Sequence, residues 1–194
     1  QNDREIVLTA VSQNGFSLRY ASIELQNDRE IVLTAVSQNG FSLGSTSIGF
    51  RKDNEIVLAA VNSRGAALQF ASGELKKDRN IVKTAIKENG LALRYASLEL
   101  QNDREIVLAA VTKNVNALQY AYDLRNDRNI VLAAVNLNGL ALKFVNPTFL
   151  DDKNIIMAAV KENGLALEFA SEEMKKDQEI VLAAVDEDGF ALQF

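Results

Sequence analysis

The sequence predicts an all-α protein, an α-solenoid of eight short helix-turn-helix repeats of about 25 residues. Three observations carry this prediction. Residues 26–43 repeat residues 1–18 letter for letter. The apolar residues of each copy recur at helical spacing rather than in the alternation of a strand. Residue types that cap helices stand before and after the main apolar segment.

The repeats follow one another directly along the 194 residues. The fifth is one residue short, and the eighth is truncated at Phe194. We therefore expect residues 1–194 to form a single continuous array, and we interpret the chain as a piece of a longer protein. The repeats, numbered 1 to 8 in chain order, span residues 1–25, 26–50, 51–75, 76–100, 101–124, 125–149, 150–174 and 175–194.

The first helix of each repeat is predicted from an apolar face and two caps. In repeat 1 the apolar residues lie at i, i+1, i+4 and i+5: Ile6, Val7, Ala10 and Val11. Asp3 precedes them and is expected to be the N-cap, because its carboxylate can accept from the first free backbone N–H groups. Asn14 and Gly15 follow, and we expect glycine to end the helix in the left-handed conformation. The rival interpretation, a leucine-rich-repeat solenoid, lacks the leucine spacing of that class.

A second, shorter helix is predicted from the next apolar residues. Leu18, Ala21 and Leu25 lie at i, i+3 and i+7, which predicts about two turns of α-helix facing the same core. Isolated helices shorter than about 12–15 residues are marginal in water. We therefore expect the stability of each repeat to come from stacking on its neighbours.

Three segments depart from the repeat. In repeat 2, Gly44 to Phe50 replaces the usual end, and its two glycines predict a frayed or bent second helix. Val115 and Asn116 stand where Asn-Gly is expected in repeat 5, which predicts a different turn. Pro147 predicts an early end to the second helix of repeat 6. We favour sequence drift as the explanation of all three, with a functional site as the alternative.

Comparison of the copies separates core positions from surface positions. The residues at positions 6, 10 and 18 never vary, whereas positions 12, 13, 16 and 19 accept many residue types. In a stack, variable positions become stripes along the surface. We take position 19 as the candidate partner-binding surface, formed by Arg19, Gln69, Arg94, Gln119, Lys143, Glu168 and Gln193.

The composition argues against several functions. The chain contains neither histidine nor cysteine, so the commonest general base, zinc ligands and thiol chemistry are missing, and we expect no enzyme, no catalytic or metal site and no cofactor. A net charge of −5 without a basic block makes nucleic acid an unfavourable partner. No apolar run reaches the roughly 18 residues of a membrane span, and no signal peptide pattern occurs. A reducing compartment is compatible with the sequence, and localisation and oligomeric state stay open.

Two other kinds of site are compatible with parts of the repeat. The acids and amides near each turn, as in residues 24–28, could form a ladder for calcium, but helix capping explains the aspartates without a metal. The aromatic residues could form a platform for stacked bases. We expect them to pack in the core instead, because they follow helical spacing and lack companion cations: Phe16, Tyr20, Phe41, Phe70, Tyr95, Tyr120, Phe144 and Phe169.

The repeated phrase D-R-E-I-V-L-A-A-V-x-x-N-G-x-A-L-x-x-A-S-x-E-L-x-N resembles a family of tandem helical repeats catalogued as a domain of unknown function. Residues 103–111 and 163–171 are close examples. The resemblance implies a helical repeat fold and a role in contacts, as in similar arrays of intracellular-bacterial effectors, protists and large viruses. Together with the variable stripes, it indicates a non-catalytic scaffold that binds a protein. The alternatives are a docking or spacer region of a larger enzyme or effector, and a structural segment of a larger assembly.

Overall fold

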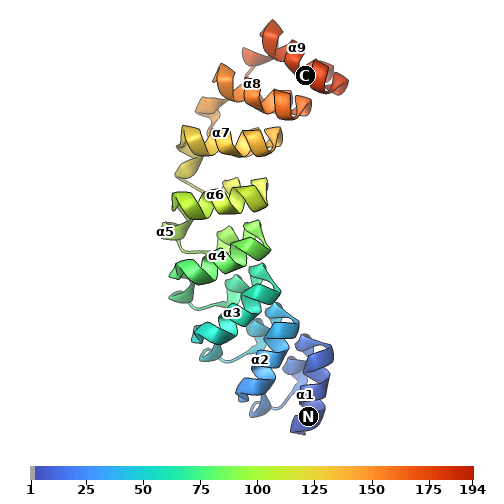
Figure 1. Ribbon diagram of the computed structural model, residues 1–194, viewed down its shortest axis with the longest axis vertical. Coiled ribbons are helices and arrows are strands. Elements are labelled where there is room, and N and C mark those ends of the chain that lie inside the picture. Colours follow the sequence, from blue (N-terminus) through green and yellow to red (C-terminus); the bar gives the residue numbers. More distant parts are fainter. Residues whose placement is uncertain (1–2) are drawn as a thin grey trace. The chain divides into compact units, whose positions relative to one another are not determined.

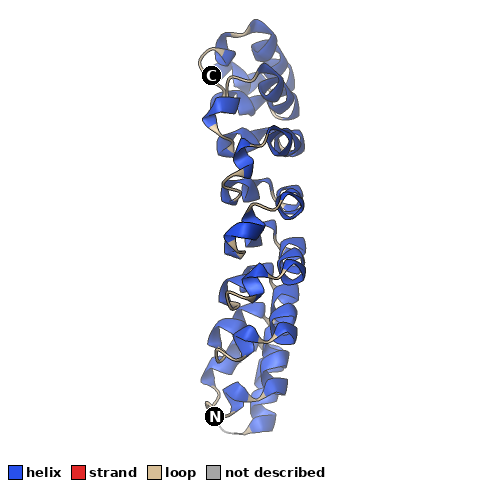
Figure 2. Ribbon diagram, turned by 90° about the vertical axis from the view of Figure 1, so that its left-hand side faces the viewer, coloured by secondary structure: helices blue, strands red, loops and turns tan. Residues whose placement is uncertain are grey.

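The computed structural model describes residues 3–194, and every regular element in that range is a helix (Figures 1 and 2). The helices fall into two compact units, which divide between Gln101 and Asn102. Each unit is a run of repeats whose successive α-helices pack against one another, so the predicted all-α solenoid is confirmed within each. Whether both units form one continuous array stays a prediction.

Unit 1 contains repeats 1 to 4. Each repeat has a ten-residue α-helix: α1 (Arg4–Gln13), α2 (Arg29–Gln38), α3 (Asn54–Ser63) and α4 (Arg79–Glu88). A six-residue 3₁₀ helix follows each one: η1 (Gly15–Tyr20), η3 (Gly40–Ser45), η5 (Gly65–Phe70) and η7 (Gly90–Tyr95). The linkers between repeats hold one short turn each: η2 (Leu25–Asn27), η4 (Phe50–Lys52), η6 (Leu75–Lys77) and α5 (Leu98–Gln101).

Unit 2 repeats the same order of elements in repeats 5 to 8. Its main helices are α6 (Arg104–Lys113), α7 (Arg128–Leu137), α8 (Lys153–Glu162) and α9 (Gln178–Glu187). Its longer 3₁₀ helices are η8 (Val115–Tyr120), η10 (Gly139–Phe144), η12 (Gly164–Phe169) and η14 (Gly189–Gln193). The short linker turns are η9 (Leu124–Asn126), η11 (Pro147–Phe149) and η13 (Met174–Lys176).

The predicted N-caps are confirmed. The Asp3 carboxylate accepts a hydrogen bond from the backbone N–H of Ile6 at 3.0 Å. The Asp28 carboxylate accepts from the N–H groups of Glu30 and Ile31 at 3.0 and 3.1 Å. The equivalent aspartate caps the main α-helix in every other repeat as well. The aspartate column therefore has a structural role at the helix starts.

The prediction of a left-handed glycine after the helix is wrong. Among residues 3–194, no glycine has a positive φ. Asn14 instead ends α1 in an extended conformation, with φ −147° and ψ 107°, and its side chain accepts from the Phe16 N–H to start η1. Gly15 is required by the next repeat, because a Cβ placed there would lie 2.2 Å from the Ala35 carbonyl oxygen. The small residues at positions 10 and 15 thus mark a close crossing between neighbouring repeats.

The second helix is a 3₁₀ helix rather than the predicted two turns of α-helix, and it ends at Tyr20. In a 3₁₀ helix, residues three apart lie above one another. Gly15 and Leu18 therefore share one buried face, which Ala21 continues just beyond the helix end. The same period places Phe16 and Arg19 together on another face, where both are exposed.

The 3₁₀ helices of the three irregular repeats keep their full length, so the predicted distortions of these helices are wrong. The linker of repeat 6 does differ, because its turn η11 starts at Pro147, two residues earlier in the repeat than η2 starts in repeat 1. The helix η3 holds its full six residues despite Gly44. Asn114 takes the usual extended cap before Val115, with φ −156° and ψ 111°, so the turn is unchanged. Pro147 starts the turn η11 after η10 has already ended at Phe144, a position that proline favours because its N–H is not needed there.

The core of each unit runs between the α-helices and the 3₁₀ helices. In repeat 2 the fully buried apolar residues are Ile31, Val32, Ala35, Val36 and Leu43. Backbone bonds also join successive linkers, since the Ser72 N–H donates to the Arg51 carbonyl at 2.8 Å and the Ser97 N–H donates to the Lys76 carbonyl at 2.9 Å. The packed core holds the 3₁₀ helices of each unit side by side, and their outer residues form one surface of the unit.

Candidate partner-binding surface

A ladder of ion pairs joins the starts of successive α-helices. The Arg29 guanidinium contacts the carboxylates of Asp53 and Glu55, both at 2.5 Å. Equivalent pairs join Arg4 to Asp28, Arg104 to Asp127, Arg128 to Asp152 and Lys153 to Asp177. Each capping aspartate in these pairs therefore bonds its own helix and a cation of the preceding repeat.

The ladder shifts the protonation equilibria of its members. The hydrogen bond from Arg29 holds the pKa of the Asp53 carboxyl below its ordinary value, and the backbone N–H of Ile56 adds to that effect. The same hydrogen bond raises the pKa of Arg29. These groups stay charged at neutral pH, so their chemistry is that of fixed structural charges rather than of proton donors.

A second column of side chains secures the ends of the 3₁₀ helices. The first residue of a repeat donates to carbonyl oxygens of the preceding 3₁₀ helix or of the residues just after it. The bonds run from Gln26 to Ala21 at 3.0 Å, from Arg51 to Gly44 at 2.7 Å, from Lys76 to Gln69 at 2.7 Å and from Gln101 to Ala96 at 3.1 Å. Burial lowers the pKa of Lys76. Sequence reasoning missed this role, although a long donor side chain recurs at the position.

The candidate residues at position 19 all lie on the 3₁₀ helices. In unit 1, Arg19, Gln69 and Arg94 belong to η1, η5 and η7. In unit 2 the stripe consists of Gln119, Lys143, Glu168 and Gln193, on η8, η10, η12 and η14. Every one of them is exposed or partly exposed. The surface position assigned from the sequence is therefore accessible, and its role in binding stays a prediction.

A groove crosses three 3₁₀ helices of unit 1 and brings two of these candidates together. Arg19 and Gln69 lie on its two sides, with Gly44 and Ser45 between them. Three aromatic side chains complete the lining: Phe16, Phe41 and Phe70. The groove has a volume of about 620 Å³, within the range of roughly 300–1,000 Å³ typical of ligand sites.

The groove is shaped by the two residues that make repeat 2 irregular. Position 20 is aromatic in the other seven repeats but is Ser45 here, and position 19 has lost its side chain at Gly44. A Cβ on Gly44 would lie 2.9 Å from the ring of Phe70, so that ring rests against the glycine backbone. Phe70 and Phe41 make an edge-to-face pair with ring centroids 6.2 Å apart.

The expectation that the aromatic residues are core residues without companion cations is wrong. Phe16 is 41% exposed and Tyr20 is 72% exposed, and the remaining members of the set are partly exposed. Cations lie over several rings, including Arg64 over Phe41 at 5.4 Å and Arg94 over Tyr95 at 5.0 Å. The three-residue period of the 3₁₀ helix turns these rings away from the buried face.

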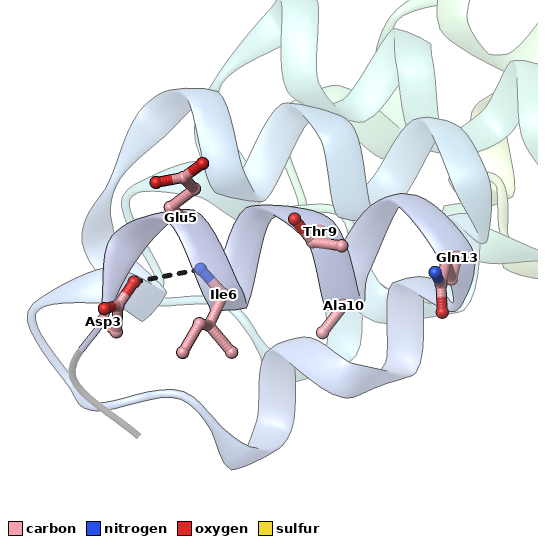
Figure 3. Close-up of a pocket in the computed structure, with 6 residues that line it drawn as sticks. All are labelled: Asp3, Glu5, Ile6, Thr9, Ala10 and Gln13. Carbon is pink, nitrogen blue, oxygen red and sulfur yellow. Dashed lines mark hydrogen bonds between the residues drawn. The ribbon is translucent and has the colours of Figure 1, made fainter.

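Another hollow, of about 460 Å³, lies on the outer face of α1. Figure 3 shows its lining: Asp3, Glu5, Ile6, Thr9, Ala10 and Gln13. Ile6 is 54% exposed, whereas its equivalent Ile31 is fully buried. The hollow therefore corresponds to the face that a preceding repeat covers elsewhere, and its carboxylate Asp3 is engaged as the N-cap (Figure 3).

Residues 3–194 contain no group of three carboxylates placed to hold a metal ion. Each capping aspartate already accepts backbone hydrogen bonds, which accounts for the residue without a calcium ligand. Within the described part of the chain, no helix has the length and apolar character that crossing a bilayer requires.

Comparison with known proteins gives one match. A family model described as "Domain of unknown function (DUF4116)" matches residues 3–51, 53–101, 78–124, 103–150 and 152–194. No curated protein matches the chain, and no solved structure does. The matched segments cover nearly the whole chain, and each spans about two of the repeats found in the sequence.

Proposed function

The chain belongs to the DUF4116 family of tandem repeats, and from that premise we propose that it is a non-catalytic scaffold that binds another protein. The observation that carries the proposal is the contrast between the buried positions and the exposed positions of the repeats. Buried positions hold nearly the same residues in every repeat, whereas the exposed position 19 changes from Arg to Gln, Lys and Glu. A constant core under a varied outer stripe suits recognition of an extended partner.

The use of the titratable groups supports the non-catalytic part of the proposal. The aspartates that recur in every repeat cap helices, and most of them also pair with a cation of the preceding repeat. Their pKa values are lowered where a shift occurs, as for Asp28 and Asp53. A general acid or base that works near neutral pH needs the opposite shift in a carboxyl group.

Affinity capture with the purified chain tests the proposal. Protein from the source organism is captured on the immobilised 194-residue chain, cross-linked and identified by mass spectrometry. The capture is repeated with a triple variant, Arg19→Glu, Arg94→Glu and Lys143→Glu. We expect a directly cross-linked protein whose yield falls by about tenfold in the variant, because rim charges steer and orient association.

The matched control is Lys52→Glu, Lys77→Glu and Lys176→Glu. These exposed lysines lie on the short linker turns η4, η6 and η13 rather than on the 3₁₀ helices that carry position 19, and their reversal changes the net charge by the same amount. The control should leave the yield unchanged. Equal loss in both variants would mean that net charge, and not the stripe, governs binding, and the absence of any cross-linked protein would contradict the scaffold function.

A further inference from the structure

We propose that the groove over η1, η3 and η5 binds an extended acidic peptide segment, with one large apolar side chain seated against Phe16, Phe41 and Phe70. This inference rests on the proposed function and assigns a ligand class to one place on the surface. Under this inference the irregular residues of repeat 2 form a recognition site, and sequence drift is not their explanation.

The space for an apolar side chain results from two side chains that repeat 2 lacks. Where other repeats present an aromatic ring and a long polar side chain, repeat 2 presents Ser45 and Gly44. The loss of both side chains opens the space between η1 and η5, and the aromatic rings that line it stay partly exposed. Open space beside exposed aromatic surface suits a partner's apolar anchor, since buried aromatic contacts carry much of the energy of interfaces.

Three arginines around the groove favour an acidic ligand. Arg19 lines it, Arg64 lies over the ring of Phe41, and Arg51 donates to the Gly44 carbonyl from one side. Among the residues that the structure describes, none of these three forms an ion pair, and the Arg51 Nε is buried without a partner.

Other arginines of the same unit contrast with them. Arg4 and Arg29 each contact two carboxylates. In a chain of net charge −5, three unneutralised guanidinium groups beside one groove create a local field that favours carboxylates. Glu88 lines a separate hollow together with Arg64 and Phe41, whereas no acidic residue is among those that line the groove.

The spacing of the cations favours a peptide over a nucleic acid. A single strand of nucleic acid needs positive charge at regular intervals along its backbone. The position-19 stripe instead passes from Arg19 to Gly44 and then to neutral Gln69. A peptide with one or two carboxylates beside an apolar residue needs only the arginines around the groove and the aromatic rings that line it.

The test uses a phage-displayed library of random linear peptides selected on the full chain. We expect enriched peptides with a Trp, Phe or Leu flanked by Asp or Glu, and synthetic copies of them are titrated by fluorescence anisotropy. Ser45→Tyr restores the aromatic residue of other repeats and fills the groove, so it should weaken binding at least about tenfold. Arg19→Glu should weaken binding by a similar factor through the charge.

The controls keep the fold and the charge change while sparing the groove. Gly73→Gln introduces a side chain at a glycine with nothing within 4 Å, and Lys52→Glu repeats a charge reversal in a linker. Both should bind within about twofold of the unchanged chain. Circular dichroism melting of every variant shows whether a loss of binding is a loss of folding.

Four outcomes decide the matter. Acidic apolar peptides that lose affinity in Ser45→Tyr and Arg19→Glu support the inference. Peptides that bind both variants as tightly as the unchanged chain overturn the inference, and the proposed scaffold function is then unaffected. A library without enrichment overturns it too, and the scaffold function is then judged by the affinity capture alone. A labelled oligothymidine that displaces the peptides and binds more tightly would assign the groove to nucleic acid instead.

Discussion

The junction between repeats 5 and 6 and the junction between repeats 6 and 7 lie next to each other in unit 2, and they differ at the point of closest approach. In the second junction Gly139 faces α8, and a Cβ there would lie 2.1 Å from the Ala159 carbonyl oxygen. In the first junction the same position is Val115. The packing of α7 against α6 and η8 is less extensive than the packing of α8 against α7 and η10.

The polar ladder does not account for this difference. Arg104 pairs with Asp127 at 2.6 Å across the first junction, and Arg128 pairs with Asp152 at 3.2 Å across the second. Both junctions therefore keep the ion pair and the N-cap. They differ in the glycine and also in the linker, because repeat 5 is one residue short and Ala121 after η8 has φ −93° and ψ 71°, whereas Val145 after η10 is extended. Glycine at position 15 permits the close approach of the next repeat, because a Cβ there would meet a backbone carbonyl that cannot move aside.

The largest expected effect comes from removing that glycine at a close junction. Gly139→Val should lower the free energy of unfolding by about 3 kcal/mol, since overpacking against backbone strains the junction. Urea unfolding monitored by circular dichroism measures the change. Gly189→Val is the matched control, because a Cβ at Gly189 meets nothing within 4 Å. If both variants lose the same free energy, backbone freedom rather than close approach explains the glycine.

Removal of the N-cap should lower the free energy of unfolding by less than Gly139→Val does, and by the same amount at both junctions. Asp127→Ala and Asp152→Ala should each cost about 0.5–2 kcal/mol, because each aspartate accepts two backbone hydrogen bonds of its own helix. Thermal and urea unfolding measure both. The exposed neighbour Asp151 provides a control, and Asp151→Ala should change the stability little. A loss confined to one junction would show that the cap depends on the packing around it.

The smallest expected effect is the loss of folding stability at acidic pH. Partial burial of Asp152 works against ionisation, but the hydrogen bonds from Arg128 and from the Ile155 N–H outweigh it and hold its pKa below the ordinary value of 3.8. Asp127 is shifted in the same direction. A carboxyl group with a lowered folded-state pKa stabilises the fold above its unfolded pKa and loses that contribution as the pH falls.

The urea midpoint should therefore fall between about pH 6 and about pH 3, and the fall should be smaller in Asp152→Asn. Arg128→Met should reduce the fall as well, because it removes one cause of the pKa shift. A midpoint that rises on acidification, or an unchanged fall in both variants, would contradict the assignment of the ladder.

The sequence predicted the features that one repeat determines by itself. The spacing of Ile6, Val7, Ala10 and Val11 and the cap at Asp3 lie within one helix, and the structure has that helix with that cap. The sequence predicts Gly15 for the wrong reason, a left-handed turn. The structure instead requires glycine there because a Cβ would meet a carbonyl oxygen of the following repeat. The recurrence of small residues at both positions 10 and 15 was the available signal of a close crossing.

The candidate surface was only partly predictable. Variation among the copies identified position 19, and the structure places Arg19 and Gln69 in one groove. The exposure of Phe16 beside Arg19 could not be inferred from α-helical spacing, since it follows from the three-residue period of η1. The groove itself results from packing between repeats, where the missing side chains of Gly44 and Ser45 leave space that Phe70 only partly fills.

Hydrogen exchange of the unchanged chain tests the role of the position-15 glycine most directly. The helices η8 (Val115–Tyr120) and η10 (Gly139–Phe144) have the same length, the same asparagine cap and the same place in their repeats. After correction for intrinsic rates, the account predicts faster exchange in η8, because α7 packs on it less extensively than α8 packs on η10. Equal or slower exchange in η8 would contradict the claim that Val115 loosens its junction.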